Sequence, residues 1–444
     1  MSQRETAREI ARQLSAAGHR ALFAGGCVRD TLLGRVPSDY DIATSAHPAE
    51  VLRLFPAAQL VGAKFGVVIV EGVEVATFRN DGSYLDGRHP ESVTYSDDPE
   101  IDAQRRDFTI NGMFLEPESD PAPDSDSLTV LDFVGGQRDL DAGLIRAIGD
   151  PVRRFAEDKL RLLRAVRFAA RFGFEIAPAT MSAIQAAASG IAEVSKERVG
   201  DELTKMLTEG HARRAFELLH ESGLLAETLP EIAAMRGVEQ PPQFHPEGDV
   251  WIHTLMMIDG LQNPTPTLAW GVLLHDVGKP PTFQAPQHPN DRIRFNNHVA
   301  VGARMAAAIC ERLRFSNRDT EQIVALVENH MRFGDVAQMK SSTLKRLLRL
   351  PAFDEHLALH RLDCLSSHRD LSAYEFVQEK LREIPPEQVS PPALLTGHDL
   401  IAMGYQPGPA FAAMLRAVED AQLEGQLHTP AEAQEWVRSR YPPA

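Results

Sequence analysis

The sequence predicts an α+β protein in which a mixed head of strands and helices is followed by a helical neck, body and tail. Up to about residue 145, short apolar runs typical of strands alternate with helical patterns. From about residue 150 onward the periodicity is almost wholly helical, and it is interrupted by the proline-rich segments EQPPQFHPEGD, GKPPTFQAPQHPND and EIPPEQVSPP. The change in periodicity separates the head from the rest of the chain.

The length and the proline-rich segments predict the domain organisation. A chain of 444 residues with 43% apolar content is expected to form about two to four domains with cores of their own. We place the head at 1–145, the neck at 146–240, the body at 241–385 and the tail at 386–444.

Three segments of the head predict local structure. MSQRETAREIARQLSAAG has the pattern of an amphipathic helix. GVVIVEGVEVATFR predicts a β-hairpin with a tight turn near Glu71 and Gly72. RRDFTINGMFLEP predicts a basic segment that passes from strand to helix.

The composition predicts a soluble protein of the cytoplasm. Cys27, Cys310 and Cys364 lie far apart and form neither a disulfide framework nor a CxxC metal motif. The first helix does not resemble a signal peptide, and no apolar run is long enough to span a membrane. A net charge of -16 disfavours a nucleic-acid partner unless one domain carries a local basic surface.

The stretch GGCVRDTLLGRVPSDYDIAT predicts a site for a cation and a phosphate. On a strand, Asp39 and Asp41 would point to one face, about 6.5 to 7 Å apart. Two such carboxylates repel unless a divalent cation lies between them, and Mg2+ suits oxygen ligands of this kind. Gly25 and Gly26 would let the backbone approach a phosphate, which Arg29 could bind as a forked donor. The alternative is an ordinary surface turn.

The segment from Pro151 to Phe172 predicts a basic helix. Its basic residues are Arg153, Arg154, Lys159, Arg161, Arg164, Arg167 and Arg171. Asp158, Arg161, Arg164 and Arg167 step by three residues, which places neighbouring members within reach along one side of a helix. Such a stripe could bind a planar anion, and the alternative is a plain solvated face.

Five ordered motifs resemble those of bacterial class II tRNA nucleotidyltransferases, the family of CCA-adding enzymes and poly(A) polymerases. They are GGCVRD, SDYDIAT, RRDFTINGM, FAEDKLRLLRAVRFAARFGFEI and SKERVGDELTKML, and they span about the first half of the chain. The resemblance implies a polymerase-β-like head in which Asp39 and Asp41 bind Mg2+. Two metals would then activate the 3′-hydroxyl of an RNA and neutralise the leaving pyrophosphate.

The resemblance also implies how the nucleotide is held. Gly26 and Arg29 would bind the triphosphate, and Arg106 would add charge near the sugar and phosphates. Asp107 would organise the site rather than act as a third metal ligand.

Base choice is implied by the EDxxR motif, which runs here from Glu157 to Arg161. Cytosine and adenine each show an amino donor beside a ring-nitrogen acceptor, so a carboxylate from Asp158 and a guanidinium from Arg161 would fit them and reject uracil and guanine. Arg164 and Arg167 would steady the base or the phosphates. The alternative is that Asp158 and Arg161 only pair with each other.

The expected partners are tRNA, ATP and CTP, and no membrane. CCA addition is the first hypothesis, and A-only addition or poly(A) synthesis is the second. The polar loop NDGSYLDGRHPESVTYSDDPEIDAQ has full length, and enzymes that stop after CC are expected to have it shortened, so CC-only addition is disfavoured.

The second half of the chain resembles an HD metal-dependent phosphohydrolase domain. The candidate ligands are His253, His275, Asp276, His298, His330 and Asp363, with the doublet in LLHDVGKP. Imidazoles with carboxylates favour Ni, Mn, Fe, Co or Zn over Mg, and six candidates suffice for a bridged pair that shares Asp276. One alternative is a domain that has kept its fold only to position tRNA. A rival hypothesis is a phosphohydrolase whose head only binds RNA.

Overall fold

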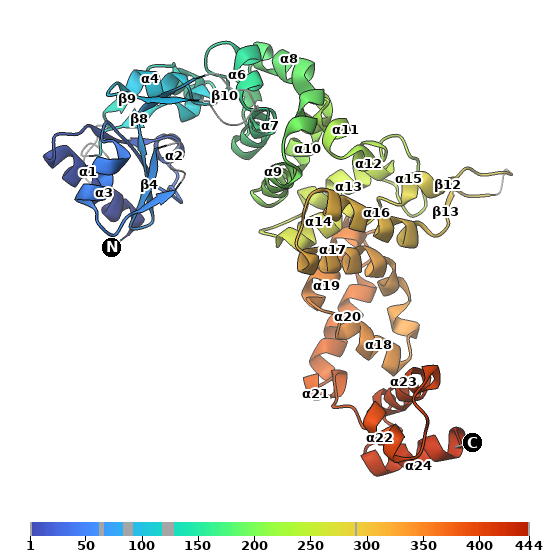
Figure 1. The fold of residues 1–444 in the computed structure, drawn as a ribbon. Helices are drawn as coiled ribbons and strands as arrows, with labels where there is room; N and C mark the ends of the chain where they lie inside the picture. Colours follow the sequence, from blue (N-terminus) through green and yellow to red (C-terminus); the bar gives the residue numbers. More distant parts are fainter. Residues whose placement is uncertain (1, 62–65, 83–91, 118–127, 289–290, 443–444) are drawn as a thin grey trace. The chain divides into compact units, whose positions relative to one another are not determined.

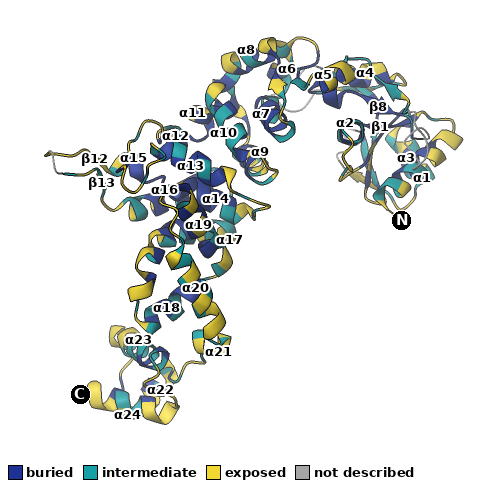
Figure 2. Cartoon of the chain, turned by 180° about the vertical axis from the view of Figure 1, so that it is seen from behind, coloured by how far each residue is buried: buried dark blue, intermediate teal, exposed yellow. Residues whose placement is uncertain are grey.

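The computed structural model describes residues 2–61, 66–82, 92–117, 128–288 and 291–442 (Figure 1). Contacts divide the chain into two compact units, Met1–Ala233 and Ala234–Ala444. No helix in the described ranges is long and apolar enough to cross a membrane. In both units the helices bury one face and expose another (Figure 2).

A seven-stranded sheet forms the centre of the head, with the strand order β3-β4-β5-β2-β1-β8-β9. Its strands are β1 Ala21–Ala24, β2 Asp41–Thr44, β3 Gln59–Val61, β4 Val67–Val70, β5 Val73–Thr77, β8 Phe114–Leu115 and β9 Val130–Leu131. The central pair β2 and β5 is parallel, and all other neighbours are antiparallel. The head is therefore a mixed sheet with helices against it.

The remaining elements of the first unit are short helices and small strand pairs. The head holds α1 Gln3–Ala16, α2 Gly26–Leu32, α3 Pro48–Leu54, α4 Pro99–Gln104, η1 Thr109–Asn111 and α5 Gly136–Asp141. The neck holds α6 Pro151–Glu157, α7 Leu160–Phe172, α8 Pro178–Ala187, η2 Ala188–Glu193, α9 Lys196–Thr208, α10 Ala212–Glu221, α11 Leu224–Thr228 and α12 Pro230–Ala233. The strand pairs are β6 Arg79–Asp81 with β7 Val93–Tyr95, and β10 Leu144–Ile145 with β11 Glu175–Ile176.

Two predictions for the head are confirmed. The first helix runs from Gln3 to Ala16 and buries Ala7, Ile10, Ala11 and Leu14 on one side. The hairpin pairs Val70 with Val73, and Glu71 and Gly72 both have positive φ, at 50° and 83°. Positive φ at both central residues matches the twist that a two-residue hairpin needs.

Two local predictions for the head are wrong in detail. Asp39 lies outside the strand, because β2 begins at Asp41 opposite Ala24, and Gly25 at φ 72° then turns β1 away into α2. RRDFTINGMFLEP does not pass from strand to helix. It forms the short turn η1 and then β8, because the Asp107 carboxylate accepts from the Phe108 backbone N–H and also from the side-chain Nδ2 of Asn111.

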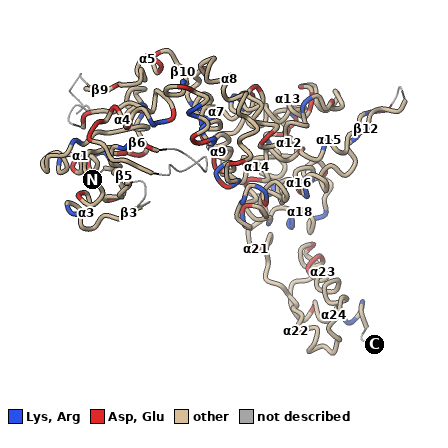
Figure 3. Tube along the Cα trace, turned by 45° about the horizontal axis from the view of Figure 1, so that its top comes forward, with Lys and Arg blue, Asp and Glu red and all other residues tan. Residues whose placement is uncertain are grey.

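The basic segment is two helices rather than one. Asp158 is extended, with φ -145° and ψ 106°, and its carboxylate accepts the Leu160 N–H at 3.0 Å. A side chain that satisfies a backbone donor in this way competes with helix continuation. Arg161, Arg164 and Arg167 therefore share α7, whereas Asp158 precedes it. Figure 3 shows Lys and Arg positions in blue along α7.

The predicted polar loop is partly structured. Its described residues include most of β6, all of β7 and the helix α4, and residues 83–91 lie outside the described ranges.

The second unit is almost wholly helical, as predicted. Its elements are α13 Val250–Asp259, α14 Pro266–Leu274, α15 Lys279–Thr282, α16 His298–Arg312, α17 Asn317–Asn329, η3 His330–Gln338, α18 Ser341–Leu348, α19 Phe353–Ser366, α20 Ser372–Glu383, α21 Pro386–Val389, α22 Gly397–Ala402, α23 Pro409–Leu423 and α24 Pro430–Arg440, with the strands β12 Phe283–Gln284 and β13 Arg294–Phe295. One buried cluster surrounds Phe333 and Leu347, and another surrounds Leu400 and Val418.

Candidate functional site

One cavity of about 570 Å³ in the first unit brings together every site residue predicted in the head and neck. These residues are Gly26, Arg29, Asp39, Asp41, Arg106, Asp158, Arg161, Arg164 and Arg167. They come from sequence positions more than a hundred residues apart, so the fold and not local spacing assembles the cavity.

Asp39 and Asp41 line this cavity, although only Asp41 belongs to β2. Reduced solvation in the surrounding protein and the Glu74 and Asp39 carboxylates, against the lowering effect of Arg106, together raise the pKa of Asp41 to about 6. Neighbouring carboxylates repel each other when both are ionised, and a divalent cation that accepts their oxygen atoms as ligands relieves this repulsion.

The glycines keep the cavity open next to two guanidinium groups. A Cβ on Gly25 would lie 3.1 Å from Arg106 Nη1, and one on Gly26 would lie 3.5 Å from Arg29 Nη2. Gly25 also has a φ of 72°, which side chains rarely adopt. The backbone can therefore approach a ligand that the two arginines contact.

Arg29 and Arg106 are both held by carboxylates. The buried Arg29 pairs with Asp30 at 2.7 Å and donates to Asn111 Oδ1 at 2.6 Å. Arg106 Nη2 lies 2.8 Å from Asp102 Oδ2. These contacts fix the direction of each guanidinium and neutralise part of its charge.

Asp107 joins the head to the neck. Its Oδ2 accepts from Arg164 Nε at 2.9 Å and Nη2 at 2.7 Å, and its Oδ1 accepts from Asn111 Nδ2 at 3.0 Å. Burial acts to raise the pKa of Asp107, but the Arg164 charge and the Asn111 hydrogen bond outweigh it and lower the pKa to about 2. Its oxygens are engaged by protein donors, which is the arrangement of an organising residue.

Asp158 and Arg161 do not pair with each other, contrary to the alternative stated for them. Arg161 Nη1 lies 2.7 Å from Glu157 Oε2, and its Nη2 donates to the Arg105 carbonyl at 3.2 Å. Asp158 Oδ2 lies 2.9 Å from Arg198 Nη2. Both residues line the cavity, and each is held by a different partner: Asp158 by Arg198 and Arg161 by Glu157.

Arg167 is also paired, with Glu202 at 2.7 Å and Glu209 at 3.1 Å. Arg164 and Arg167 both lie over the Phe168 ring, at 5.1 and 4.5 Å from its centroid. The positive charge of the α7 arginines is therefore partly neutralised by carboxylates from other parts of the chain.

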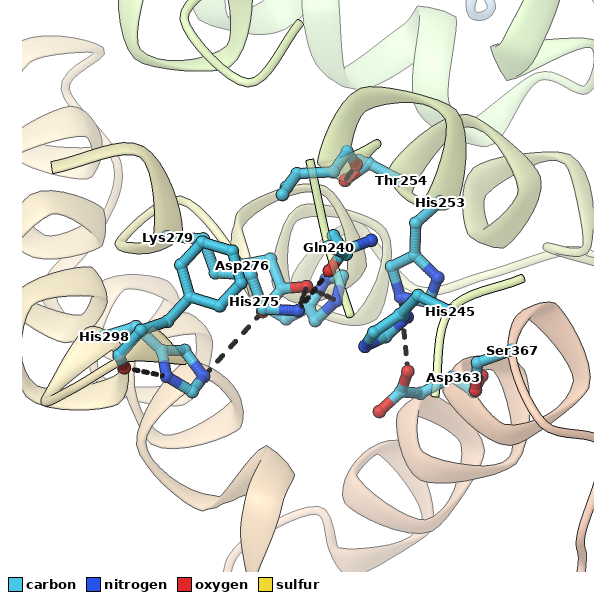
Figure 4. Close-up of polar contacts among 12 residues, drawn as sticks. Gln240, His245, His253, Thr254, His275, Asp276, Lys279, His298, Asp363 and Ser367 are labelled. Carbon is cyan, nitrogen blue, oxygen red and sulfur yellow. Dashed lines mark hydrogen bonds and ion pairs between the residues drawn. The ribbon is translucent and has the colours of Figure 1, made fainter. Parts of the chain in front are cut away.

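A second site lies in the helical unit, where the predicted ligands converge (Figure 4). His253 Nε2 lies 3.2 Å from Asp363 Oδ1, and His275 Nε2 lies 3.0 Å from Asp276 Oδ2. The Nε2 atoms of His298 and His330 lie 3.9 and 3.8 Å from Asp276 Oδ1. The structure therefore brings all six predicted ligands together, and Asp276 lies within 4.0 Å of three of the other five.

The imidazoles of this site are oriented as metal ligands are. His275, His298 and His330 each direct Nδ1 at a backbone carbonyl, at 2.8, 3.0 and 2.7 Å. Their Nε2 atoms are buried, and none of the three makes a hydrogen bond of acceptable geometry among the described residues, although that of His275 lies close to Asp276. An Nδ1–H donated outward leaves the Nε2 lone pair facing inward, so the donor set fits a transition metal.

Four residues of this site were missed by the sequence interpretation. Lys279 Nζ lies 2.7 Å from Asp276 Oδ2 and donates to Gln240 Oε1 at 2.6 Å. His245 and Glu247 lie beside His253. Gln240, His245 and Glu247 all belong to the proline-rich segment EQPPQFHPEGD, which has no periodicity that would mark a ligand.

The fold and the two sites have the organisation of a nucleotidyltransferase-type head followed by an HD-type helical body. Three family models match it: the poly A polymerase head domain at residues 21–146, the probable RNA and SrmB-binding site of polymerase A at 173–236, and the HD domain at 250–383. The CCA-adding enzyme of Levilactobacillus brevis is 30% identical over 427 residues, which cover 95% of this chain and 94% of that protein. The chain belongs to the CCA-adding enzyme family.

Other relatives match mainly one half. The CCA-adding enzyme of Geobacillus thermodenitrificans is 46% identical over 228 residues, which are 50% of this chain and 54% of that protein. The chain spans about half the length of this relative and of the CCA-adding enzymes of Geobacillus kaustophilus and Geobacillus stearothermophilus.

Solved structures confirm the predicted fold class. The crystal structure of the Bacillus stearothermophilus CCA-adding enzyme in complex with CTP has a TM-score of 0.75 at 27% identity, and covers 99% of this chain and 98% of its own. The Thermotoga maritima CCA-adding enzyme complexed with tRNA shares the fold, with a TM-score of 0.55 at 20% identity, and covers 98% of this chain and 94% of its own.

Proposed function

We propose that the chain adds CCA to the 3′ end of tRNA from CTP and ATP, without a nucleic-acid template. The observation that carries this proposal is the single cavity that joins Asp39 and Asp41 to Asp158 and Arg161. The family membership and the CTP complex of a similar enzyme support it.

Asp39 and Asp41 would hold Mg2+. Bound Mg2+ would supply a lowered pKa for the attacking hydroxyl and charge neutralisation for the leaving pyrophosphate. Gly26 would admit the triphosphate close to the backbone, and Arg29 and Arg106, fixed by their carboxylate partners, would donate to its oxygens.

Asp158 and Arg161 would choose the base. The Asp158 carboxylate would accept from an amino group, and the Arg161 guanidinium would donate to a ring nitrogen, which fits C and A but leaves unpaired groups against U and G. Arg198 and Glu157 would hold these two side chains in place, and Arg164 and Arg167 would steady the base or the phosphates.

The test is incubation with tRNA transcripts that end at the discriminator base, at C or at CC, with each labelled nucleotide in turn. CCA addition predicts C incorporation into the first two transcripts and A incorporation into the third. Incorporation into the CC-ending transcript alone would mean A-only addition, and extension by many A residues would mean poly(A) synthesis.

The HD-type centre would hold one or two transition metals, Ni, Mn, Fe, Co or Zn, and hydrolyse a phosphate ester at an RNA 3′ end or on a small nucleotide. The inward-facing Nε2 atoms of three histidines support metal binding. The rival, in which the chain is chiefly a phosphohydrolase with an RNA-binding head, predicts hydrolysis without nucleotide addition.

We also propose the four-domain division at 1–145, 146–240, 241–385 and 386–444, and a cytoplasmic location. The separate buried cluster around Leu400 and Val418 supports a distinct tail. The three cysteines are free and buried, as suits a reducing compartment.

A further inference from the structure

The segment between α12 and α13 contributes a buried carboxylate next to the HD-type centre. Glu247 lies just before α13, and its side chain is only 5% exposed. Its Oε1 lies 2.7 Å from His253 Nδ1 and 2.8 Å from His245 Nδ1. A buried carboxylate needs such donors, and here both donors are imidazoles.

The contact decides which nitrogen His253 offers to the centre. An imidazole that donates Nδ1–H to a carboxylate presents the other nitrogen to a ligand. That nitrogen, Nε2, lies 3.2 Å from Asp363 Oδ1 and belongs to the same cluster as His275. Glu247 therefore lies on the outer side of the His253 ring, and the cluster lies on the inner side.

His253 differs from the other imidazoles of the centre in this respect. His275, His298 and His330 are each oriented by a backbone carbonyl, which any residue could supply. His253 is oriented by a side chain that mutation can remove. An anionic acceptor also raises the basicity of the imidazole more than a neutral carbonyl does.

We propose that Glu247 is a positioning residue of the HD-type metal centre: it fixes the ring plane and tautomer of His253, and His245 holds it in place. This inference rests on the proposed metal binding by the centre. The two imidazoles engage Oε1 of Glu247, whereas its buried Oε2 has no hydrogen-bond partner among the described residues.

The loop does not depend on Glu247 for its own structure. Asp249 caps α13 by accepting the Ile252 N–H at 2.8 Å, and it also accepts the Gly237 N–H at 2.6 Å. A change at Glu247 should therefore leave the loop attached to α13.

The test compares Glu247→Gln and Glu247→Ala with the matched control Glu355→Gln in the full-length chain. Glu355 lies in the same unit and accepts from Thr265, Thr267 and Gln322, so the control removes a hydrogen-bonded carboxylate whose partners are not candidate ligands of the centre. Mn2+ affinity is measured by titration calorimetry, and the visible spectrum is recorded after loading with Co2+.

We expect Mn2+ affinity to fall by about 10- to 100-fold in Glu247→Ala, less in Glu247→Gln, and not in the control. The Co2+ spectrum should change in the Glu247 variants alone. Unchanged affinity and an unchanged spectrum in Glu247→Ala would overturn the proposal. Loss of a whole equivalent of metal in His245→Ala would also overturn it, because His245, Glu247 and His253 would then form a metal site of their own.

A second measurement separates this proposal from the proposed function. The Nδ1–H proton of His253, assigned by its absence in His253→Gln, should give a slowly exchanging downfield NMR signal in wild type without metal, and Glu247→Ala should lose it. If wild type binds no metal but shows this signal, the metal function fails and the positioning contact stands. If the signal is equally strong in Glu247→Ala, the positioning role fails whatever the metal content.

Discussion

Asp107 and Arg164 lie 57 positions apart in the sequence and form a two-pronged ion pair, with Nε and Nη2 of Arg164 at 2.9 and 2.7 Å from Oδ2 of Asp107. The pair joins the segment just before η1 in the head to α7 of the neck. Because it lies on the wall of the cavity, it couples the stability of this unit to the geometry of the site.

Replacement of Asp107 by Asn should destabilise the first unit by about 2 to 4 kcal/mol, because Arg164 loses its charged partner. Differential scanning calorimetry should show a lower melting temperature for one transition and not for the other. The exposed Asp141→Asn serves as control. A melting profile identical to wild type would show that the pair contributes nothing to stability.

The stability of the same unit should fall in acid. The pKa of Asp107 is lowered from 3.8 to about 2 in the folded chain, so its contribution is complete above about pH 4 and is lost as the pH falls through 2. The shift corresponds to about 2 kcal/mol. Unfolding monitored between pH 5 and 2 should be less pH-dependent in Asp107→Asn than in wild type, and equal slopes would contradict the assignment.

Asp39→Ala and Asp41→Ala should each abolish nucleotide addition and leave tRNA binding nearly intact, because the carboxylates would serve the metals and not the RNA. Primer extension and a gel-shift assay measure the two properties, with Asp141→Ala as control. Substantial transfer activity in either variant would exclude the two-metal role.

Arg161→Ala should raise the incorporation of U and G relative to C and A. The expected change is about 1 to 3 kcal/mol per lost or unsatisfied polar contact, or about 5- to 150-fold. Arg153 is a suitable control, because its side chain is 85% exposed. An enzyme that is slower but has the same base preference would assign Arg161 to phosphate binding or to support of Glu157.

His275→Ala and Asp276→Ala should lose the transition metal and any phosphatase or 2′,3′-cyclic phosphodiesterase activity, and should keep nucleotide addition. Elemental analysis after dialysis measures the bound metal, and assays of phosphatase, 2′,3′-cyclic phosphodiesterase and nucleotide addition measure the three activities. A metal-free wild type without hydrolysis would mean that the body only positions tRNA.

Short-range patterns predicted much of this molecule. The turn at Glu71 and Gly72, the helical second half and the convergence of the six HD-type ligands all follow from periodicity, turn chemistry or motif order. The break at Asp158 did not, because a side chain competing for one backbone N–H leaves no mark in apolar periodicity.

The carboxylate partners of the arginines could not be predicted from the sequence either. Arg164 meets Asp107, and Arg167 meets Glu202 and Glu209, at sequence separations of 35 to 57 positions. Only the packing of α7 against the head and α9 brings these charges together. Glu247 was missed for a similar reason, since its role depends on which side of the His253 ring it contacts.

The ends of two helices also give the HD-type centre an electrostatic direction. α14 ends immediately before His275, whereas α16 begins at His298, so the two helices present opposite ends to the centre. Aligned peptide dipoles place partial negative charge at the end of α14, which favours a nearby cation by about 0.3 to 1 kcal/mol, and partial positive charge at the start of α16. The backbone therefore makes the His275 side of the cluster the more favourable side for positive charge, and a mutation that unwound the last turn of α14 would weaken cation binding without altering a single ligand.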